Sequence, residues 1–234
     1  GQVLQEVGDL EGALQAHNAA LRVEEAFHRR DPKNRVWRTA LMRRKSMIGD
    51  LLGSPAMPNL GNLSGAMDQY RQSAAILEEN LAADSRDAQA MRGLALLYRK
   101  MANVERETNP RAAAALYNKA LEQSTALLAL TPANRDFQGA HANSLSGLGE
   151  ALRLAGDRAG AAEKLKEARI LQESLIAADP SRTVYKQDLV TTEHRLGDLW
   201  LDMNDPAAAR TAYRHALERT ETMPSADPYT QFLL

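Results

Sequence analysis

The sequence lacks cysteine and contains few aromatic and few β-branched aliphatic residues. Without cysteine, disulfides, thiolate nucleophiles and zinc–thiolate sites are excluded. Aromatic residues make up 5% of the chain, and Val and Ile together account for 11 of its 234 residues. Strands prefer these residue types, so their scarcity argues against a β-sheet. The chain instead contains 40 Ala and 33 Leu, which have high helix propensity, and this predicts an all-α fold.

The sequence also lacks an excess of either charge and any long apolar run. Its net charge of −1 provides no long-range field that would attract nucleic acid to the whole molecule. No apolar run approaches the ~20 residues of a membrane-spanning helix, so we expect no membrane segment. The first residues, Gly1–Glu6, have neither the basic start nor the apolar core of a signal peptide, and an initiator Met is absent. We therefore expect a cytoplasmic segment of a longer chain.

Two turn signals recur five times in register. The first ends in Asp or Asn, and its copies begin at residues 8, 61, 108, 156 and 204. The second is similar to Asp-Pro, and its copies begin at residues 31, 84, 131, 179 and 227. The second signal follows the first by 23 residues each time, and the steps between copies are 53, 47, 48 and 48 residues. Two turn types with a shared period indicate a repeat protein.

Each repeat is predicted to contain two helices of roughly 18–21 residues. The Asp or Asn of the first signal is a preferred N-cap. Pro110 and Pro206 follow it at the first helical position, where proline is tolerated. Asn34, Asp87 and Asn134 are the candidate N-caps of the other helix.

The second copy contains an insertion. The stretch Gly53–Asn59 accounts for the longer step of 53 residues, and its two prolines, Pro55 and Pro58, cannot continue a helix. We predict a protruding loop between paired helices. Such a loop can carry function, but surface loops also tolerate insertions freely.

A further pattern recurs within the helices. In the fifth copy, Leu196 and Gly197 lie in the first helix, and Ala209, Tyr213 and Ala216 follow in the second. The corresponding residues of the other copies are Leu148, Gly149, Ala161, Leu165 and Ala168; Ala113, Tyr117 and Ala120; Ile48, Gly49, Ala66 and Tyr70; and Gly1, Ala13, His17 and Ala20. In the third copy, Met101 is expected at the position of the glycine. The pattern resembles the tetratricopeptide repeat (TPR), in which small residues let helices approach closely.

The resemblance implies a right-handed α-solenoid of antiparallel helix pairs, with a period of 48 residues instead of the usual ~34. The predicted repeats are 1–33, 34–86, 87–133, 134–181 and 182–228 in a single array, with 229–234 starting a sixth. Solenoids normally end in polar capping helices, whereas both ends here cut a repeat. We therefore expect exposed apolar edges and end-to-end self-association. Similar long repeats occur behind bacterial serine/threonine kinase domains, which implies a regulatory region of such a signalling protein.

The residues that usually carry chemistry form no recognisable constellation. The five histidines are His17, His28, His141, His194 and His215. No two of them are three or four positions apart, so there is no local helical metal pair. Gly-rich phosphate loops and Gly-x-Ser-x-Gly elbows are also absent. We expect no catalytic residue, no metal and no cofactor, and we interpret His17 as a packed core residue.

A basic run lies in the first quarter of the chain. Its eight cations are Arg29, Arg30, Lys33, Arg35, Arg38, Arg43, Arg44 and Lys45. One hypothesis is a patch that binds an acidic peptide, phosphate or nucleic acid. The other is a solvated helix surface, because on a helix of 3.6 residues per turn these side chains point several ways. We favour the second hypothesis and keep polyanion binding as the alternative.

The resemblance to TPR arrays also implies a concave groove, lined by the first helix of each repeat, that holds a protein or peptide. Its side chains should lie off the apolar stripe of those helices. The candidates are Arg43, Asp50, Tyr98, Arg99, Asn143, Ser146, Glu150, Arg153, His194, Arg195 and Asp198. This mixed charged and polar set suits an extended peptide better than catalysis. We therefore predict a non-catalytic protein-binding scaffold.

Overall fold

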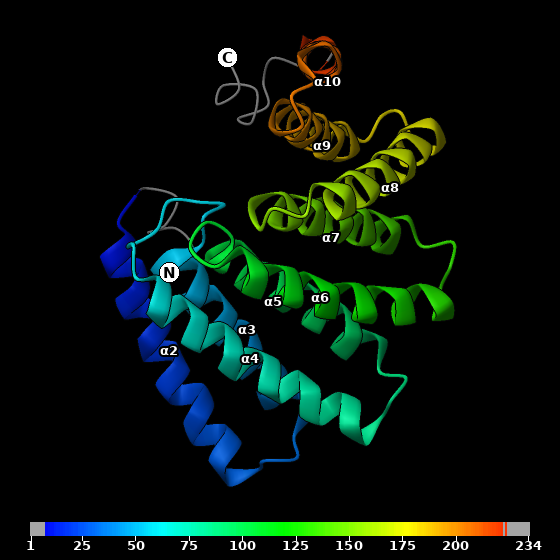
Figure 1. Cartoon of the computed structure of the whole chain (residues 1–234). Helices are drawn as coiled ribbons and strands as arrows, with labels where there is room; N and C mark the ends of the chain where they lie inside the picture. Colours follow the sequence, from blue (N-terminus) through cyan, green and yellow to red (C-terminus); the bar gives the residue numbers. More distant parts are fainter. Residues whose placement is uncertain (1–7, 222, 224–234) are drawn as a thin grey trace. The chain divides into compact units, whose positions relative to one another are not determined.

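The computed structural model of the chain describes residues 8–221 and 223. These residues form helices α2 (Leu10–Arg30), α3 (Arg35–Gly53), α4 (Leu63–Ala83), α5 (Ala88–Glu105), α6 (Pro110–Leu130), α7 (Arg135–Leu154), α8 (Arg158–Ala178), α9 (Thr183–Asp202) and α10 (Pro206–Glu221) (Figure 1). The described part of the chain contains no strand. The prediction of an all-α fold is confirmed.

The chain divides into two compact units, residues 1–107 and 108–234. The first unit contains α2 to α5, and the second contains α6 to α10. Within each unit, consecutive helices pack side by side and are joined by short turns, so neighbouring helices run antiparallel (Figure 1). The predicted architecture of antiparallel helix pairs in a helical repeat is therefore confirmed. The five repeat boundaries remain a prediction, and the sixth repeat at 229–234 lies outside the described residues.

The turns of the sequence become the N-caps of the helices. The first signal supplies side-chain oxygens that accept a backbone N–H three residues on, from Asp9, Asn62, Asn109, Asp157 and Asp205. The second signal is followed by the caps of α3, α5 and α7, which are Asn34, Asp87 and Asn134. Each such bond satisfies a donor that the first helical turn would otherwise leave unpaired. The predicted caps are thus confirmed.

The turn between α5 and α6 differs from its counterparts. Before α2, α4, α8 and α10 the chain contains a residue of positive φ: Gly8, Gly61, Gly156 and Asn204. Glycine and asparagine tolerate this left-handed conformation, which reverses the chain sharply. Among the described residues, the α5–α6 turn has no residue of this kind. The division between the two units falls in this turn, after Glu107.

Glycine lets the paired helices approach closely. A Cβ on Gly49 would lie 2.6 Å from Cε1 of Tyr70, and a Cβ on Gly149 would lie 2.6 Å from Cγ of Leu165. At Gly197, the added Cβ would overlap the ring of Tyr213. These are the contacts between helices that the TPR-like pattern predicts, in α3–α4, α7–α8 and α9–α10. Gly1, the glycine of the first copy, lies outside the described residues.

The third copy corrects one detail of this pattern. Large and small buried residues alternate along α9 as Leu196 followed by Gly197, and the same buried spacing in α5 is met by Met101 followed by Ala102. Ala102, with 0% exposure, therefore takes the place of the glycine, and Met101 takes that of the leucine. The expected register was one residue off because it was counted back from the α5–α6 turn, where this copy is one residue shorter.

The insertion forms the predicted loop, at 54–62 between α3 and α4. The side-chain amide of Asn59 donates to the carbonyls of Ser54 and Met57, at 2.9 and 3.0 Å. Backbone bonds from Leu60 to Leu51 and from residue 62 to residue 52 close the loop onto the end of α3. The extra residues therefore lie outside the helix pair without changing its packing.

Candidate protein-binding site

The predicted groove residues all lie in the first helices of the repeats. In the first unit these are Arg43 and Asp50 in α3, and Tyr98 and Arg99 in α5. In the second unit they are Asn143, Ser146, Glu150 and Arg153 in α7, and His194, Arg195 and Asp198 in α9. Arg43 and His194 are exposed, and the other nine are half-buried or buried. Most of the set is therefore packed within its own unit.

Asp50 is the centre of a polar cluster in the first unit. Its carboxylate accepts a hydrogen bond from Tyr70 Oη at 2.7 Å and bonds from Lys100 Nζ at 2.7 and 2.8 Å. The same Nζ donates to Ser46 Oγ at 3.1 Å. Burial and the neighbouring carboxylate raise the pKa of Tyr70, which keeps its hydroxyl protonated as a donor. The cluster links α3 to α4 and α5, so Asp50 stabilises the unit.

The two candidates in α5 are also packed within the unit. Tyr98 is buried, and its hydroxyl donates to Glu78 Oε1 in α4 at 2.7 Å. Arg99 is half-buried. Tyr98 therefore joins two helices of the core and does not present its hydroxyl to a ligand.

A second polar cluster links α7 to α9 in the second unit. Ser146 Oγ and Thr192 Oγ1 lie 2.8 Å apart in a hydrogen bond, and Arg195 Nη1 donates to the same Ser146 oxygen at 2.8 Å. Asn143 Nδ2 donates to Asp188 Oδ2 at 2.9 Å. Lys100 on Ser46 and Arg195 on Ser146 are equivalent contacts in the two units. A cation on one first helix thus binds the serine of the preceding first helix in both units.

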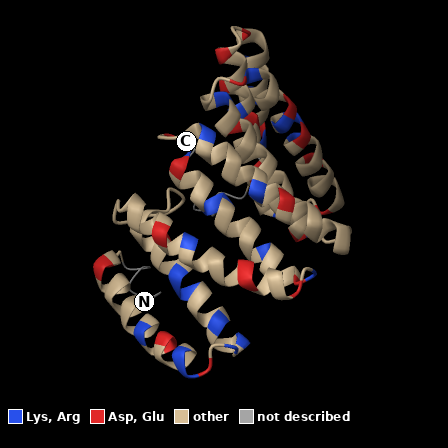
Figure 2. Cartoon of the chain, turned by 60° about the horizontal axis from the view of Figure 1, so that its bottom comes forward, with Lys and Arg blue, Asp and Glu red and all other residues tan. Residues whose placement is uncertain are grey.

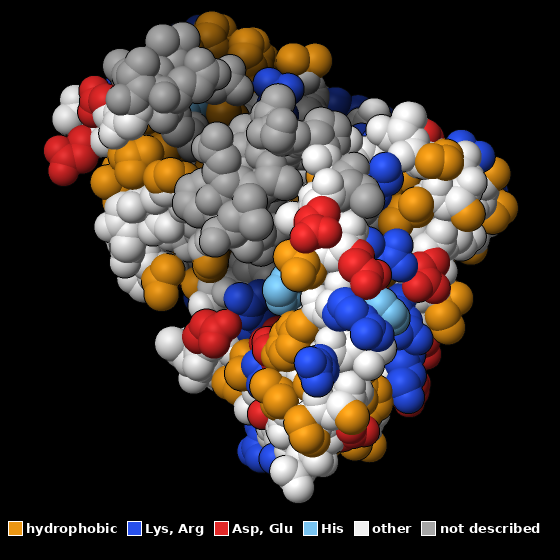
Figure 3. Space-filling view, turned by 90° about the horizontal axis from the view of Figure 1, so that it is seen from above, with side chains coloured by type: hydrophobic (Ala, Val, Ile, Leu, Met, Phe, Trp, Pro, Cys, Tyr) orange, Lys and Arg blue, Asp and Glu red, His pale blue; other side chains and the backbone are white. Residues whose placement is uncertain are grey.

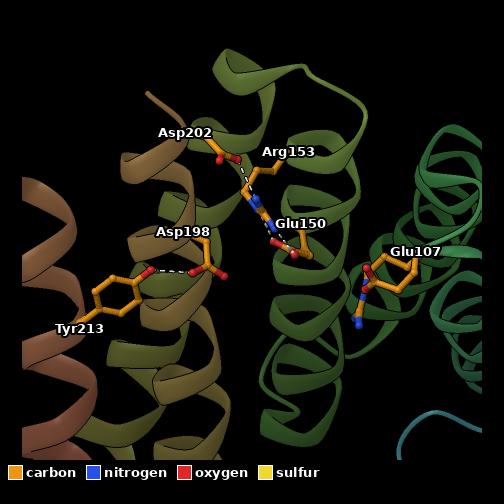
Figure 4. A network of polar contacts seen from close by, with 7 residues as sticks. Glu107, Glu150, Arg153, Asp198, Asp202 and Tyr213 are labelled. Atoms are coloured by element: carbon orange, nitrogen blue, oxygen red, sulfur yellow. Dashed lines mark hydrogen bonds and ion pairs between the residues drawn. The ribbon is translucent and has the colours of Figure 1, made fainter. Parts of the chain in front are cut away.

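The C-terminal half of α7 holds a buried ion-pair network (Figure 4). Arg153 donates from Nε and Nη2 to the two carboxylate oxygens of Glu150, both at 2.9 Å, and from Nη1 to Asp202 at 2.7 Å. These hydrogen bonds raise the pKa of the Arg153 guanidinium, and Glu150 is 8% exposed. A ligand would have to break this bidentate pair to reach either side chain.

Asp198 is held by the following helix. Tyr213 Oη donates to its carboxylate at 2.6 Å (Figure 4). Burial, followed by the Asp198 bond, raises the pKa of Tyr213 to about 12. The ring of His194 lies 5.9 Å from that of Tyr213, tilted by 51°. The pair repeats the Asp50–Tyr70 contact of the first unit, so this bond belongs to the TPR-like helix pair.

An open pocket of about 680 Å³ lies between α3, α4 and α5 in the first unit. Val36, which is 70% exposed, and Ala40 form part of its apolar lining, one helical turn apart in α3. The predicted Arg43 lies one turn further on, and the amides of Asn80 and Gln89 line the opposite side. Among the eleven candidates, Arg43 is the one that lines this pocket.

Sequence reasoning missed the other lining residues of this pocket. Asn80 comes from α4, a second helix, whereas the search was restricted to first helices. Val36 could have been found from its spacing of seven residues to Arg43, which places both on one face of α3.

Much of the basic run is neutralised by ion pairs. The pairs are Arg35–Asp87 at 3.0 Å, Arg38–Glu79 at 3.0 Å, Arg44–Glu24 at 2.8 Å and Lys45–Glu25 at 3.5 Å. Basic and acidic residues are accordingly interspersed along the helices in Figure 2. Apolar side chains are likewise interleaved with charged and polar ones on the face seen in Figure 3. The pairing favours a charged helix surface over a patch for polyanions.

His17 is a packed core residue, as expected. It is 2% exposed, and its Nδ1 lies 2.7 Å from Arg44 Nη1, so the neutral ring accepts a hydrogen bond there. Burial is the main cause of its lowered pKa, with the Arg44 charge second. In residues 8–221 and 223, no group of three or more His, Asp or Glu side chains is arranged to hold a metal ion. None of the helices in this part has the length and hydropathy needed to cross a bilayer.

Comparison with protein-family models and with curated proteins gave no match. Two solved structures are similar at low sequence identity. MamA is 16% identical over 93% of this chain and 92% of that chain, with a TM-score of 0.45. BtubC (BKLC) from P. vanneervenii is 17% identical over 94% of both chains, with a TM-score of 0.46. Similarity at this level concerns the helical fold and does not extend to function.

Proposed function

We propose that the chain is a non-catalytic scaffold that binds a protein or peptide on the first helices of its repeats. The observation that carries this proposal is the open pocket between α3, α4 and α5. It lies in the first unit, where the predicted Arg43 is exposed, whereas most of the other predicted groove residues are bonded to neighbouring helices.

The lining of the pocket suits an extended peptide. Val36 and Ala40 offer an apolar contact for one side chain, and Asn80 and Gln89 offer amide donors and acceptors for a peptide backbone. Arg43 forms no ion pair among the described residues and offers a cation for an acidic group. Apolar surface with a few polar groups is typical of ligand-binding pockets.

The proposal is tested by peptide selection. A random dodecamer library displayed on phage is selected against the purified chain, and the enriched peptides are measured by fluorescence anisotropy. Val36→Asp and Arg43→Glu should each weaken binding at least tenfold, because they remove the apolar contact and the cation.

Arg111→Glu is the matched control, since Arg111 is exposed in α6 and the charge change is the same as at Arg43. It should leave affinity unchanged. If no peptide is enriched, or if the pocket variants bind as the wild type does, the pocket is not the binding site.

Polyanion binding through Arg29–Lys45 is disfavoured by the four ion pairs that neutralise half of its cations. A filter-binding titration with a 20-base-pair duplex tests it, and a steep loss of affinity with salt would support it. A cytoplasmic location, a signalling role and a place in a bacterial kinase regulator stay predictions from the sequence.

A further inference from the structure

Helix α2 has two faces of different character. On the face toward α3, Ala13 and His17 are buried. Glu24 and Glu25 also point toward α3, where they pair with Arg44 and with the lysine at position 45. The acidic side chains in the second half of α2 are therefore used inside the first unit.

The opposite face, which we name the α2 outer face, consists of Ala19, Arg22, Val23, Ala26, Phe27 and Arg30. These six residues line a hollow of about 360 Å³. Val23 is 55% exposed and Phe27 is 39% exposed. Ala19, Val23, Ala26 and Arg30 recur at intervals of three and four residues, the spacing of one continuous helical stripe.

The apolar part of this face is held rigidly. The ring of Phe27 stacks on that of Trp37 in α3, with centroids 4.5 Å apart and an interplanar angle of 9°. The Arg30 guanidinium lies 6.0 Å from the centroid of the Phe27 ring. Stacked aromatic rings lose little conformational freedom on binding a partner, so this platform is preorganised.

The charge of the α2 outer face is of one sign. Arg22 and Arg30 lie one at each end of the exposed Val23–Phe27 segment, and neither forms an ion pair among the described residues. No acidic side chain lines the hollow in that part of the chain. A complementary surface would therefore be apolar along its centre and acidic beside that centre.

We propose that the α2 outer face docks an amphipathic helix of a partner protein, with acidic side chains flanking its apolar stripe. The stripe from Ala19 to Arg30 spans about three helical turns, which matches the anchors of helix-in-groove recognition. The face is separate from the pocket between α3, α4 and α5, so the two proposals can fail independently.

A second copy of the chain fits this face poorly. If two α2 outer faces paired symmetrically, each would bring Arg22 and Arg30 to an interface without acidic residues, and like charges across an interface are costly. The end-to-end self-association expected from the sequence is therefore disfavoured at this face.

The test uses two synthetic 21-residue helical peptides and the chain carrying Trp200→Phe. The first peptide has Leu and Ala along one stripe with flanking Glu, and the second has Lys in place of Glu. Since Trp37 is then the sole tryptophan and stacks on Phe27, its emission reports binding at this face. The Glu peptide should shift this emission saturably and bind at least tenfold more tightly than the Lys peptide.

Two variants of the face should weaken the Glu peptide at least tenfold: Val23→Asp, and the double change Arg22→Glu with Arg30→Glu. All three positions are exposed, and circular dichroism checks that the fold is kept. The matched control is Arg111→Glu with Arg158→Glu, which makes the same charge change at exposed positions of α6 and α8. It should leave affinity unchanged, as should Val36→Asp in the pocket.

The proposal is overturned if the Glu peptide fails to bind, if the Lys peptide binds equally well, or if the Arg22 and Arg30 reversal has no effect. Sedimentation velocity of the chain alone provides the remaining check. A dimer that Val23→Asp dissociates would assign the face to a second copy and contradict the acidic partner.

Discussion

The pairs α2–α3 and α9–α10 are held together in different ways. In α2, Ala13 and His17 are the buried residues, and ion pairs from Arg44 and Lys45 supply much of the contact with α3. In α10, three alanines and a threonine are buried, and Gly197 of α9 lies directly against the ring of Tyr213. The first pair depends on charge, and the second depends on close packing of small residues.

This difference shows that one repeat pattern can support two kinds of interface. Close packing is insensitive to salt and pH, whereas ion pairs are screened by salt and a histidine next to them titrates near neutral pH. The two pairs should therefore respond differently to mutation and to solution conditions.

Gly197→Ala should have the largest effect. The new Cβ would overlap the Tyr213 ring and displace its hydroxyl from Asp198, so we expect a loss of about 2 kcal/mol of unfolding free energy despite the better helix propensity of Ala. Chemical denaturation followed by circular dichroism measures it. Gly139→Ala is the control, because its Cβ would lie 3.5 Å from Tyr185 in ordinary contact. Equal stability of the two variants would contradict the packing assignment.

Arg44→Leu should weaken the α2–α3 pair by about 1.5 kcal/mol, because it leaves half-buried Glu24 and the ring of His17 without their donor. Hydrogen exchange should become roughly tenfold faster in α2 and stay unchanged in α10. Arg71→Leu provides the comparison, since its pair with Asp68 is exposed and should be worth less than about 0.5 kcal/mol. Unchanged protection of α2 in Arg44→Leu would show that packing, not charge, holds this pair.

Acidification should loosen the same pair by about 1 kcal/mol. Burial lowers the pKa of His17, so the stability that its neutral ring provides is complete above the unfolded pKa of about 6.5 and is lost as the pH falls below it. Hydrogen exchange of α2 should therefore speed up between pH 7.5 and 5.5, after correction for intrinsic rates. His17→Leu should abolish this pH dependence, and its persistence there would assign the effect to another group.

Glu193→Gln should have the smallest effect, and one of opposite sign in pH. Glu193 is 1% exposed in α9, and burial raises its pKa although Arg169, His215 and Arg219 oppose the shift. Its contribution to stability is complete below the unfolded pKa of about 4.3 and is lost as the pH rises. Glu193→Gln should therefore raise the thermal midpoint by about 2 °C at pH 7 and leave it unchanged at pH 4. A lower midpoint at pH 7 would show that the carboxylate is stabilised by its neighbours.

The fold could be predicted in detail because its signals are local. A cap such as Asn62 bonds to a backbone N–H three residues away, and the chain reversal at Gly61 needs one residue of positive φ. Gly197 and Tyr213 contact each other across one short turn. Each of these signals is contained within one repeat, so five copies reinforce them.

The candidate site was harder to predict because its contacts span whole repeats. Lys100 bonds to Asp50, and Arg195 bonds to Ser146, at separations of 50 and 49 residues. The spacing within a single helix places these side chains off the core stripe but does not reveal the cation that the next first helix brings to them. Arg43 belongs to the pocket because no such cation or acid reaches it from the described helices.

The loop at 54–62 has a practical consequence for engineering. Since its ends are fastened to α3 by Leu60 and Asn62, the chain length between them is independent of how α3 packs on α4. A fluorescent reporter or an affinity tag inserted at Ala56 would meet an exposed chain that has already accommodated extra residues. This position is therefore a natural entry point for a sensor that reports on binding in the first unit.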